Sequence, residues 1–429
     1  MKKTLKNLLS VLSFTVVIML ISTSCEDMSY IKHTYTANIP VTYMTFAELR
    51  SAIKVENPQA LKDPGKLFFK SNYIFVVEKY KGIHVIDNEY PSNPKNIAFI
   101  KVPGCVDISI VGNILYADSY TDLVAMDISD ITNVTVTKRI EDAFEYKYNG
   151  YDSDYPVAQY DSKKGIVTEW EVKEITEKIE TDNYPRNSGG GMSVLGAKSD
   201  TEVGYNYSGD AIGKAGSTAR FITFSNYLYI IHNFQVEIYD ISQPENPSNT
   251  NQSLSTSRNI ETLFVYQNYL FIGSTTGMLI YSLSNPLTPT YVSSFDHATA
   301  CDPVVVEGNY AYVTVRSGSS CGGFSDQLDI IDISNITYPS SINTYQLESP
   351  YGLGIDNKTL FICDGDAGLK ILNVTNPYDI QIIIEYPGIN AFDVIPFNNV
   401  LLMIGSDGLY QYDYSDINDI QLLSKIEIG

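Results

Sequence analysis

The side chains that could carry chemistry are spread along the chain without a catalytic pattern. The four histidines, His33, His84, His232 and His297, show no metal-ligand spacing. The run from Gly318 to Gly322 (GSSCG) formally matches a nucleophile elbow. That motif requires a strand-to-helix turn and a histidine partner, whereas this run lies in a predicted β-loop. The sequence contains no dinucleotide fingerprint and no phosphate-binding loop. No motif therefore argues positively for catalysis.

Carboxylates that follow short apolar runs are the other candidates for a site. The candidate binding residues are Asp107, Asp118, Asp122, Asp302, Arg316, Asp364 and Asp366. Carboxylates that converge could bind a cation such as calcium, or a basic group, and no other cofactor is indicated. The alternative is turn chemistry, because Asp-Gly at 364 to 365 is what a two-residue hairpin needs. The elements that carry these residues decide whether they converge.

Those elements repeat. Leu360 to Tyr386 reads as three apolar strands separated by tight turns, and two anchors recur with it. The first anchor is an asparagine before an apolar strand: Asn72, Asn113, Asn226, Asn268, Asn309, Asn357 and Asn399. The second is a polar residue that closes a later strand: Asp87, Asp127, Asp240, Ser282, Asp332, Asn373 and Asp413. A period of about 41 residues with four short strands is typical of propeller blades. The sequence thus predicts an all-β fold, a seven-bladed β-propeller.

The expected blade geometry gives the candidate residues a common face. In an up-and-down blade, the start of the first strand and the loop between strands two and three lie at the same end. The candidate carboxylates and Arg316 would then share one face, with Asp107 and Asp302 close to the channel mouth if the first strand is innermost. Cys301 and Cys321 fall at this end of blade five, which predicts a disulfide in an exported protein. A thiol pair that holds a metal is the alternative. Cys105 and Cys363 are expected to be free, buried thiols.

The repeats resemble those of LVIVD-repeat proteins. The resemblance rests on the turn Asp-Ile-Ser at 127 to 129, 240 to 242 and 332 to 334, and on Asn-Pro at 93 to 94, 246 to 247 and 376 to 377. Ser282 and Asn373 depart from the pattern. The resemblance implies an exported β-propeller lipoprotein, like those of Bacteroides-type bacteria, and most members of that family lack a defined biochemical role.

Residues 1–24 have the features of a lipoprotein signal peptide. Three lysines precede an apolar run from Leu8 to Ile21, and small residues lead directly to Cys25. We expect Cys25 to be acylated, which would anchor the protein in the cell envelope, in the outer membrane, on a side that the sequence does not specify. A plain signal peptide with an incidental cysteine is the alternative.

The rest of the chain divides into a tether and the propeller. Residues 25–64 form the tether, with a short helix from Phe46 to Lys54 that is capped by Thr45 and Glu48. Residues 65–429 form the propeller. An insertion at about 141–217 separates blades two and three, because Asp127 and Asn226 lie much further apart than anchors elsewhere. A hairpin with mobile flanks is favoured for it over an eighth, degenerate blade.

The charge of the chain limits its possible binding partners. The formal net charge of −21 would repel a phosphate backbone, which argues against nucleic acid. Two functions remain. The first is a membrane-anchored, non-catalytic binding or scaffolding propeller whose ligand is a protein or a carbohydrate. The second is an exported enzyme that acts on glycans or another envelope substrate, which would need a pair of catalytic carboxylates.

Overall fold

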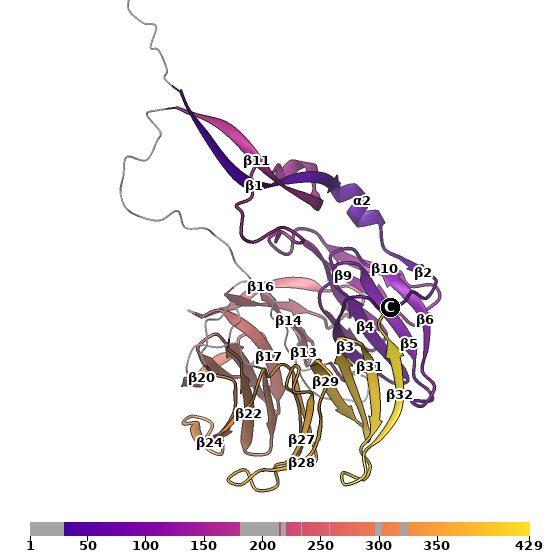
Figure 1. Ribbon diagram of the computed structural model, residues 1–429, viewed down its shortest axis with the longest axis vertical. Coiled ribbons are helices and arrows are strands. Elements are labelled where there is room, and N and C mark those ends of the chain that lie inside the picture. The colour runs from indigo at the N-terminus through magenta and orange to yellow at the C-terminus, as the bar shows by residue number, and fades with distance from the viewer. Residues whose placement is uncertain are drawn as a thin grey trace, which may run out of the picture. The chain divides into compact units, whose positions relative to one another are not determined.

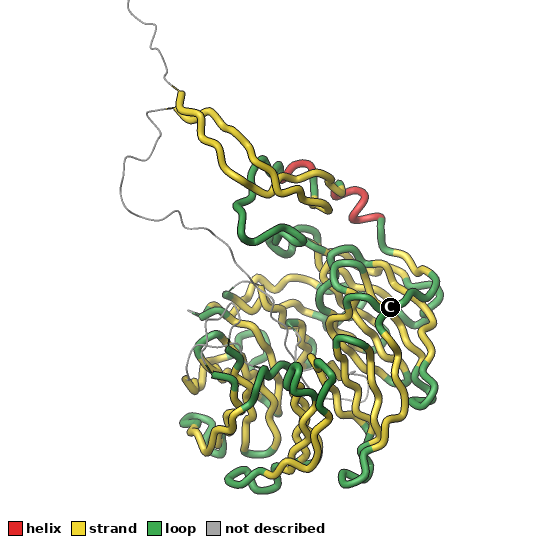
Figure 2. Tube along the Cα trace, in the orientation of Figure 1, coloured by secondary structure: helices red, strands yellow, loops and turns green. Residues whose placement is uncertain are grey.

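The structure is a computed structural model. It describes residues 30–180, 214–215, 220–232, 234–256, 258–296, 303–317 and 325–429. Within these residues the chain forms two compact units, and helix is confined to one short α-helix and one 3-10 turn (Figure 2).

The larger unit is a seven-bladed β-propeller, which confirms the predicted fold class (Figure 1). Every blade is an antiparallel sheet in chain order. Blades 1 to 3 contain β3 (Pro64–Lys70), β4 (Tyr73–Glu78), β5 (Gly82–Asp87), β6 (Lys95–Lys101); β7 (Ile108–Val111), β8 (Ile114–Ser119), β9 (Asp122–Asp127), β10 (Thr135–Ile140); and β13 (Phe221–Phe224), β14 (Tyr227–His232), β15 (Gln235–Asp240), β16 (Ser248–Ser255). Blades 4 and 5 contain β17 (Ile260–Tyr266), β18 (Tyr269–Ser274), β19 (Gly277–Ser282), β20 (Thr290–Asp296); and β21 (Val304–Glu307), β22 (Tyr310–Val315), β23 (Gln327–Asp332), β24 (Ser340–Gln346). Blades 6 and 7 contain β25 (Leu353–Asp356), β26 (Thr359–Cys363), β27 (Leu369–Asn373), β28 (Gln381–Tyr386); and β29 (Ala391–Phe397), β30 (Val400–Gly405), β31 (Gly408–Asp413), β32 (Gln421–Glu427).

The second repeat anchor works as a side-chain turn. In all seven blades its side-chain oxygen accepts a hydrogen bond from the backbone N–H two residues further on. Asp240, for example, accepts from Ser242 at 2.7 Å, while Ser282 accepts from Ser284 at 3.3 Å. Any short side chain with an oxygen at this point can make the bond. This explains why Ser282 and Asn373 can replace aspartate in the repeat.

The first anchor supplies a backbone acceptor. The carbonyl of Asn113, in the turn between β7 and β8, accepts from Ile128, which follows the third strand of the blade. Six of the seven anchors make the equivalent bond. In blade 6 the acceptor is Lys358 rather than Asn357, because Asn357 is the first residue of its two-residue turn, whereas the anchor asparagine is the second residue in the other blades.

The outermost strand of every blade carries a register shift at the same place. In each blade the first two residues of the fourth strand pair with the end of the third strand, and the pairing then skips one residue, or two in blade 3. The skipped residue is Ile97 in blade 1 and Leu423 in blade 7. These are β-bulges, which bend a strand and increase its twist.

The ring closes through side chains and the C-terminus. The first strands of neighbouring blades contact each other around the ring, with β29 against β3. Between blades 7 and 1, Ser424 donates to the carbonyl of Pro91 at 2.6 Å, and Gln411 donates to Asn88 at 2.7 Å. The N–H of the last residue, Gly429, donates to Leu61 at 2.8 Å. Among the described strands, none is exchanged between the first and last blades, since each of these two blades contains its own four consecutive strands.

Blade 1 has a further strand on each edge. β2 (Lys54–Glu56) pairs with its outermost strand β6, and β12 (Lys214–Ala215) pairs with its innermost strand β3 at Phe68 and Phe69. Helix α2 (Phe46–Ser51) precedes β2, and its N-cap Thr45 and Glu48 form the predicted capping box. The helix ends at Ser51 rather than at Lys54 as predicted, because Lys54 already pairs with Lys101 of β6.

The smaller unit is built from the two segments that lie outside the repeats. β1 (Tyr30–Met44) and β11 (Ile166–Glu180) form a two-stranded sheet, which we call the arm. The strands are antiparallel, because Thr34 contacts Thr176 at 2.8 Å and Thr168 donates to the carbonyl of Thr42. The predicted tether and the predicted insertion therefore contribute one strand each to a common element. Residues 1–29, with the predicted signal peptide and Cys25, lie outside the described residues.

Apolar side chains fill the sheets of the propeller. Two of its largest fully buried side chains, Phe75 and Phe361, lie in the second strands of blades 1 and 6. Within the described residues, no helix is long and apolar enough to cross a membrane.

Candidate functional site

The candidate carboxylates mostly lie at the expected end of the blades, but they bind the protein's own backbone. Asp118, at the end of the second strand of blade 2, accepts from the N–H groups of Val106 and Asp107 at 2.8 and 3.0 Å. Asp364 of blade 6 accepts from Glu348 and Ser349 in the same way. These N–H groups belong to the segment that leads into the first strand, where no β-ladder satisfies them. Each carboxylate therefore fixes the start of its own blade.

Glu78 repeats this arrangement in blade 1. Its two oxygens accept from the N–H groups of Lys62 and Asp63, each at 3.0 Å. Its Oε2 atom also lies 3.2 Å from Nε2 of the buried His84. Burial alone would raise the pKa of Glu78, but the bonds from Lys81 and the backbone outweigh it and hold the pKa below its ordinary value. Burial lowers the pKa of His84, although Glu78 opposes that shift.

Asp107 joins blade 2 to blade 3. Its side chain is buried at the start of the first strand, where Oδ1 accepts from Ile108 at 2.7 Å. Oδ2 accepts from the N–H groups of Arg220 and Phe221, which begin blade 3. Burial raises the pKa of Asp107 to about 7, and the positive charge of Lys66 limits the rise.

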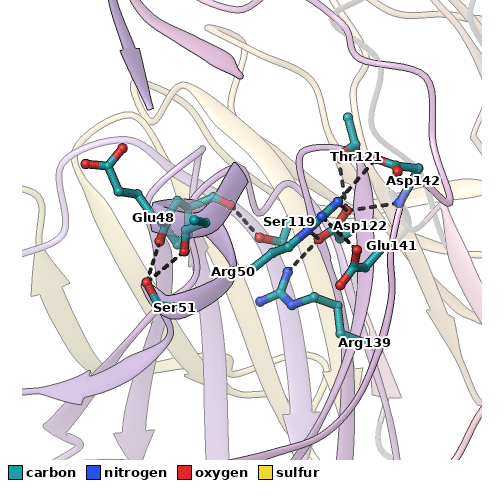
Figure 3. A network of polar contacts seen from close by, with 11 residues as sticks. Glu48, Arg50, Ser51, Ser119, Thr121, Asp122, Arg139, Glu141 and Asp142 are labelled. Atoms are coloured by element: carbon teal, nitrogen blue, oxygen red, sulfur yellow. Dashed lines mark hydrogen bonds and ion pairs between the residues drawn. The ribbon is translucent and has the colours of Figure 1, made fainter. Parts of the chain in front are cut away.

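Asp122 is the centre of a network of ion pairs in blade 2 (Figure 3). Arg50 of α2 donates to its Oδ2 through Nε at 3.0 Å, and Arg139 of β10 donates to the same oxygen at 3.0 Å. The backbone N–H of Asp142 donates to Oδ1 at 3.0 Å. Arg50 also pairs with Glu141 at 2.7 Å. Burial would raise the pKa of Asp122, but the two guanidinium groups and the N–H of Asp142 hold it below its ordinary value. The network fastens α2 to blade 2.

Basic side chains accompany the other acids of this end. Lys370 pairs with Asp364, Lys425 with Asp407 at 2.9 Å, and Lys81 with Glu78 at 2.9 Å. In blades 1, 6 and 7, an acid at this end is therefore paired with a lysine of the same blade.

The remaining predicted residues are dispersed. The guanidinium of Arg316 lies 4.0 Å from the centre of the Tyr351 ring, which in turn contacts Phe392 edge-on at 5.4 Å. Asp366 is exposed in its turn. Cys301, Asp302 and Cys321 lie outside the described residues, so the disulfide stays a prediction.

The predicted free thiols are confirmed. Cys105 and Cys363 are buried and unpaired, and burial raises both of their pKa values. Among the residues that the structure describes, no group of three or more histidine, cysteine, aspartate or glutamate side chains is placed to hold a metal ion.

Sequence reasoning missed a second carboxylate network in blade 3. Nδ1 of His232 lies 2.9 Å from Glu237, whose other oxygen accepts from Tyr239 at 2.7 Å. The N–H of Glu145 donates to Nε2 of His232 at 3.0 Å. Through these contacts of its two ring nitrogens, His232 holds the segment after β10 against blade 3. The only signal in the sequence is the short spacing of His232, Glu237 and Tyr239, which alone does not predict a contact.

Comparison with known proteins supports the repeat architecture. A family model described as LVIVD repeat matches residues 105–142, 257–297 and 299–346, which contain blades 2, 4 and 5. A search of curated proteins found no match.

Solved structures share the fold at low identity. A protein from Lactobacillus plantarum is 10% identical, with 85% of this chain and 98% of that chain covered and a TM-score of 0.53. The periplasmic gluconolactonase of Pseudomonas aeruginosa is 10% identical, with 85% and 96% covered and a TM-score of 0.53. At this identity the likeness shows the fold alone. The chain thus carries LVIVD repeats within a seven-bladed β-propeller.

Proposed function

We propose that this LVIVD-repeat propeller is a non-catalytic binding or scaffolding protein of the cell envelope, anchored in the outer membrane through an acylated Cys25. Its ligand would be a protein or a carbohydrate. The observation that supports this function most is the use of the carboxylates. Asp107, Asp118, Asp122 and Asp364 all hold backbone or guanidinium groups, so they stabilise a rigid platform.

A second observation favours binding. The chain leaves its repeats twice, before blade 1 and after blade 2, and the two excursions together form the arm. The arm is not needed to complete any blade. Recognition proteins typically have such an added element on a rigid scaffold.

The anchor is tested by fractionation. We expect Cys25→Ala to abolish incorporation of labelled fatty acid and to move the protein from the membrane to the soluble fraction, or to leave it uncleaved, because a multiply acylated cysteine buries enough methylene groups for stable attachment. Cys105→Ala, which alters a buried free thiol, is the control and should stay at the membrane. Fatty-acid labelling and membrane association that persist in Cys25→Ala would contradict the anchor.

A further inference from the structure

The outer edge of β11 has the properties of a docking site for an extended polypeptide. β11 is 15 residues long and pairs with β1 on one side. Within the described residues, no strand pairs with its other side. An unpaired edge presents a row of backbone N–H and C=O groups, which can accept an added strand. β1 differs, because the bridge between Asn38 and Val157 occupies part of its outer edge.

The charge of β11 selects the partner. The strand contains five glutamates and two lysines. Glu169, Glu171 and Glu174 are exposed, and the ion pair between Lys173 and Glu171 also lies at the surface. Two copies of β11 laid edge to edge would bring these like charges together, which disfavours self-pairing. A basic strand would instead place opposite charges across the new pair.

Apolar side chains mark one face of the same edge. Val172 is 43% exposed and shares its face of the strand with Trp170, because side chains two residues apart point the same way. A two-stranded sheet is also marginally stable in water on its own, so a third strand would stabilise the arm.

We propose that the outer edge of β11 binds a basic, extended segment of a partner protein by β-strand addition. Backbone hydrogen bonds would give the affinity. Lysine or arginine side chains alternating with apolar ones would place the basic groups on the face of Glu169 and Glu171, and the apolar groups on the opposite face with Trp170 and Val172. The inference rests on the proposed binding role but does not depend on the acyl anchor.

The chain's single tryptophan reports on this edge directly. Trp170 lies within β11, and its Nε1 donates to the carbonyl of Asn149 at 2.9 Å. The probe is a synthetic peptide of alternating lysine and valine, added to the full chain, with tryptophan fluorescence excited where tyrosine does not absorb. We expect a saturable change in emission that weakens as salt is raised. A peptide of the same charge with prolines in its centre should give no such change, because it cannot form the ladder.

Two double variants distinguish binding at this edge from attraction to the overall negative charge of the chain. Glu169→Gln combined with Glu171→Gln changes two exposed glutamates on one face of the strand and should weaken binding by about threefold to tenfold. Glu89→Gln combined with Glu385→Gln removes the same charge from exposed positions on the propeller and should leave binding unchanged. Equal binding of the proline peptide, or equal weakening by both double variants, would reduce the interaction to non-specific attraction and overturn the proposal.

Other occupants give distinct results. If the peptide shows no saturable binding at any concentration, the glutamates keep added strands away from the edge. That result overturns the proposal. A dimer of the full chain in light scattering that the peptide does not dissociate would identify a second copy as the occupant and would overturn it as well. Neither result affects the membrane anchor, which is tested by Cys25→Ala.

Discussion

At the scale of single residues, the buried carboxylate of Asp122 holds helix α2 against blade 2. Its side chain is inaccessible and pairs with Arg50 and Arg139. We expect Asp122→Asn to lower the free energy of unfolding by about 3 kcal/mol, because it leaves two guanidinium groups near a neutral side chain. Glu141→Gln changes an exposed partner of Arg50 and should cost less than about 1 kcal/mol. Urea unfolding measures both, and equal costs would contradict the central role of Asp122.

Asp107 should give the protein a recognisable pH dependence. Its pKa is about 7 in the folded protein against 3.8 ordinarily. A carboxyl group whose pKa rises on folding adds stability that is complete below its unfolded pKa and is lost as the pH rises through its folded pKa. Asparagine does not titrate, so Asp107→Asn should lose more stability relative to the natural protein at about pH 5 than at about pH 8. Unfolding midpoints of both proteins at the two pH values test this, and a constant difference would show that the pKa is not raised.

The positions of these carboxylates could be predicted from the sequence, but their role could not. Asp118 and Asp364 were expected at the same end of their blades, and the structure brings each to the start of the first strand. Their role could not be predicted, because their partners are backbone N–H groups. Nearly every residue type has such a group, so the partners leave no pattern in the sequence. The two-residue hairpin considered for Asp364 and Gly365 is wrong, because residues 364–368 connect β26 to β27, and the carboxylate of Asp364 instead binds the segment that precedes the first strand.

At the scale of elements, the second anchor should tolerate only side chains with an oxygen acceptor. Asp240 accepts from the N–H of Ser242 at 2.7 Å in the turn after β15. We expect Asp240→Ala to cost about 1 kcal/mol of unfolding free energy, since it leaves that N–H without its partner, whereas Asp240→Asn should cost little. Thermal or urea unfolding distinguishes the two variants. Similar losses in both would mean that charge, rather than the hydrogen bond, selects aspartate.

Local periodicity predicted the blades but not the arm. Each blade is made of consecutive strands joined by turns, so its pattern lies within about 41 residues of sequence. β1 pairs with β11, and two complete blades lie between them in the chain. The alternation in residues 166–180 predicts a strand, but nothing in that stretch identifies its partner. The capping box at Thr45 and Glu48 was predictable for the opposite reason, since all of its atoms lie within one turn.

At the scale of the whole molecule, the junction between blades 7 and 1 should be the weakest in the ring. Ser424 donates to Pro91 across this junction at 2.6 Å, and Ser293 donates to Ile336 across the junction of blades 4 and 5 at the same distance. Each serine-to-alanine change should cost about 1 kcal/mol at equilibrium. Only the first junction lacks a covalent connection between its blades, so Ser424→Ala should raise the unfolding rate more than Ser293→Ala. Stopped-flow unfolding in urea compares them, and equal rates would show that the ring does not open there first.

The bulge in the outermost strand of every blade also has a consequence for crowded solutions of this protein. A propeller exposes many strand edges around its circumference, and each could template intermolecular β-structure if it were flat and continuous. The skipped residue breaks the regular row of donors and acceptors and twists the edge away from a neighbouring molecule. Blade 1, whose edge is additionally covered by β2, is protected twice. The same local irregularity, repeated around the ring, therefore favours solubility over fibre formation at high concentration.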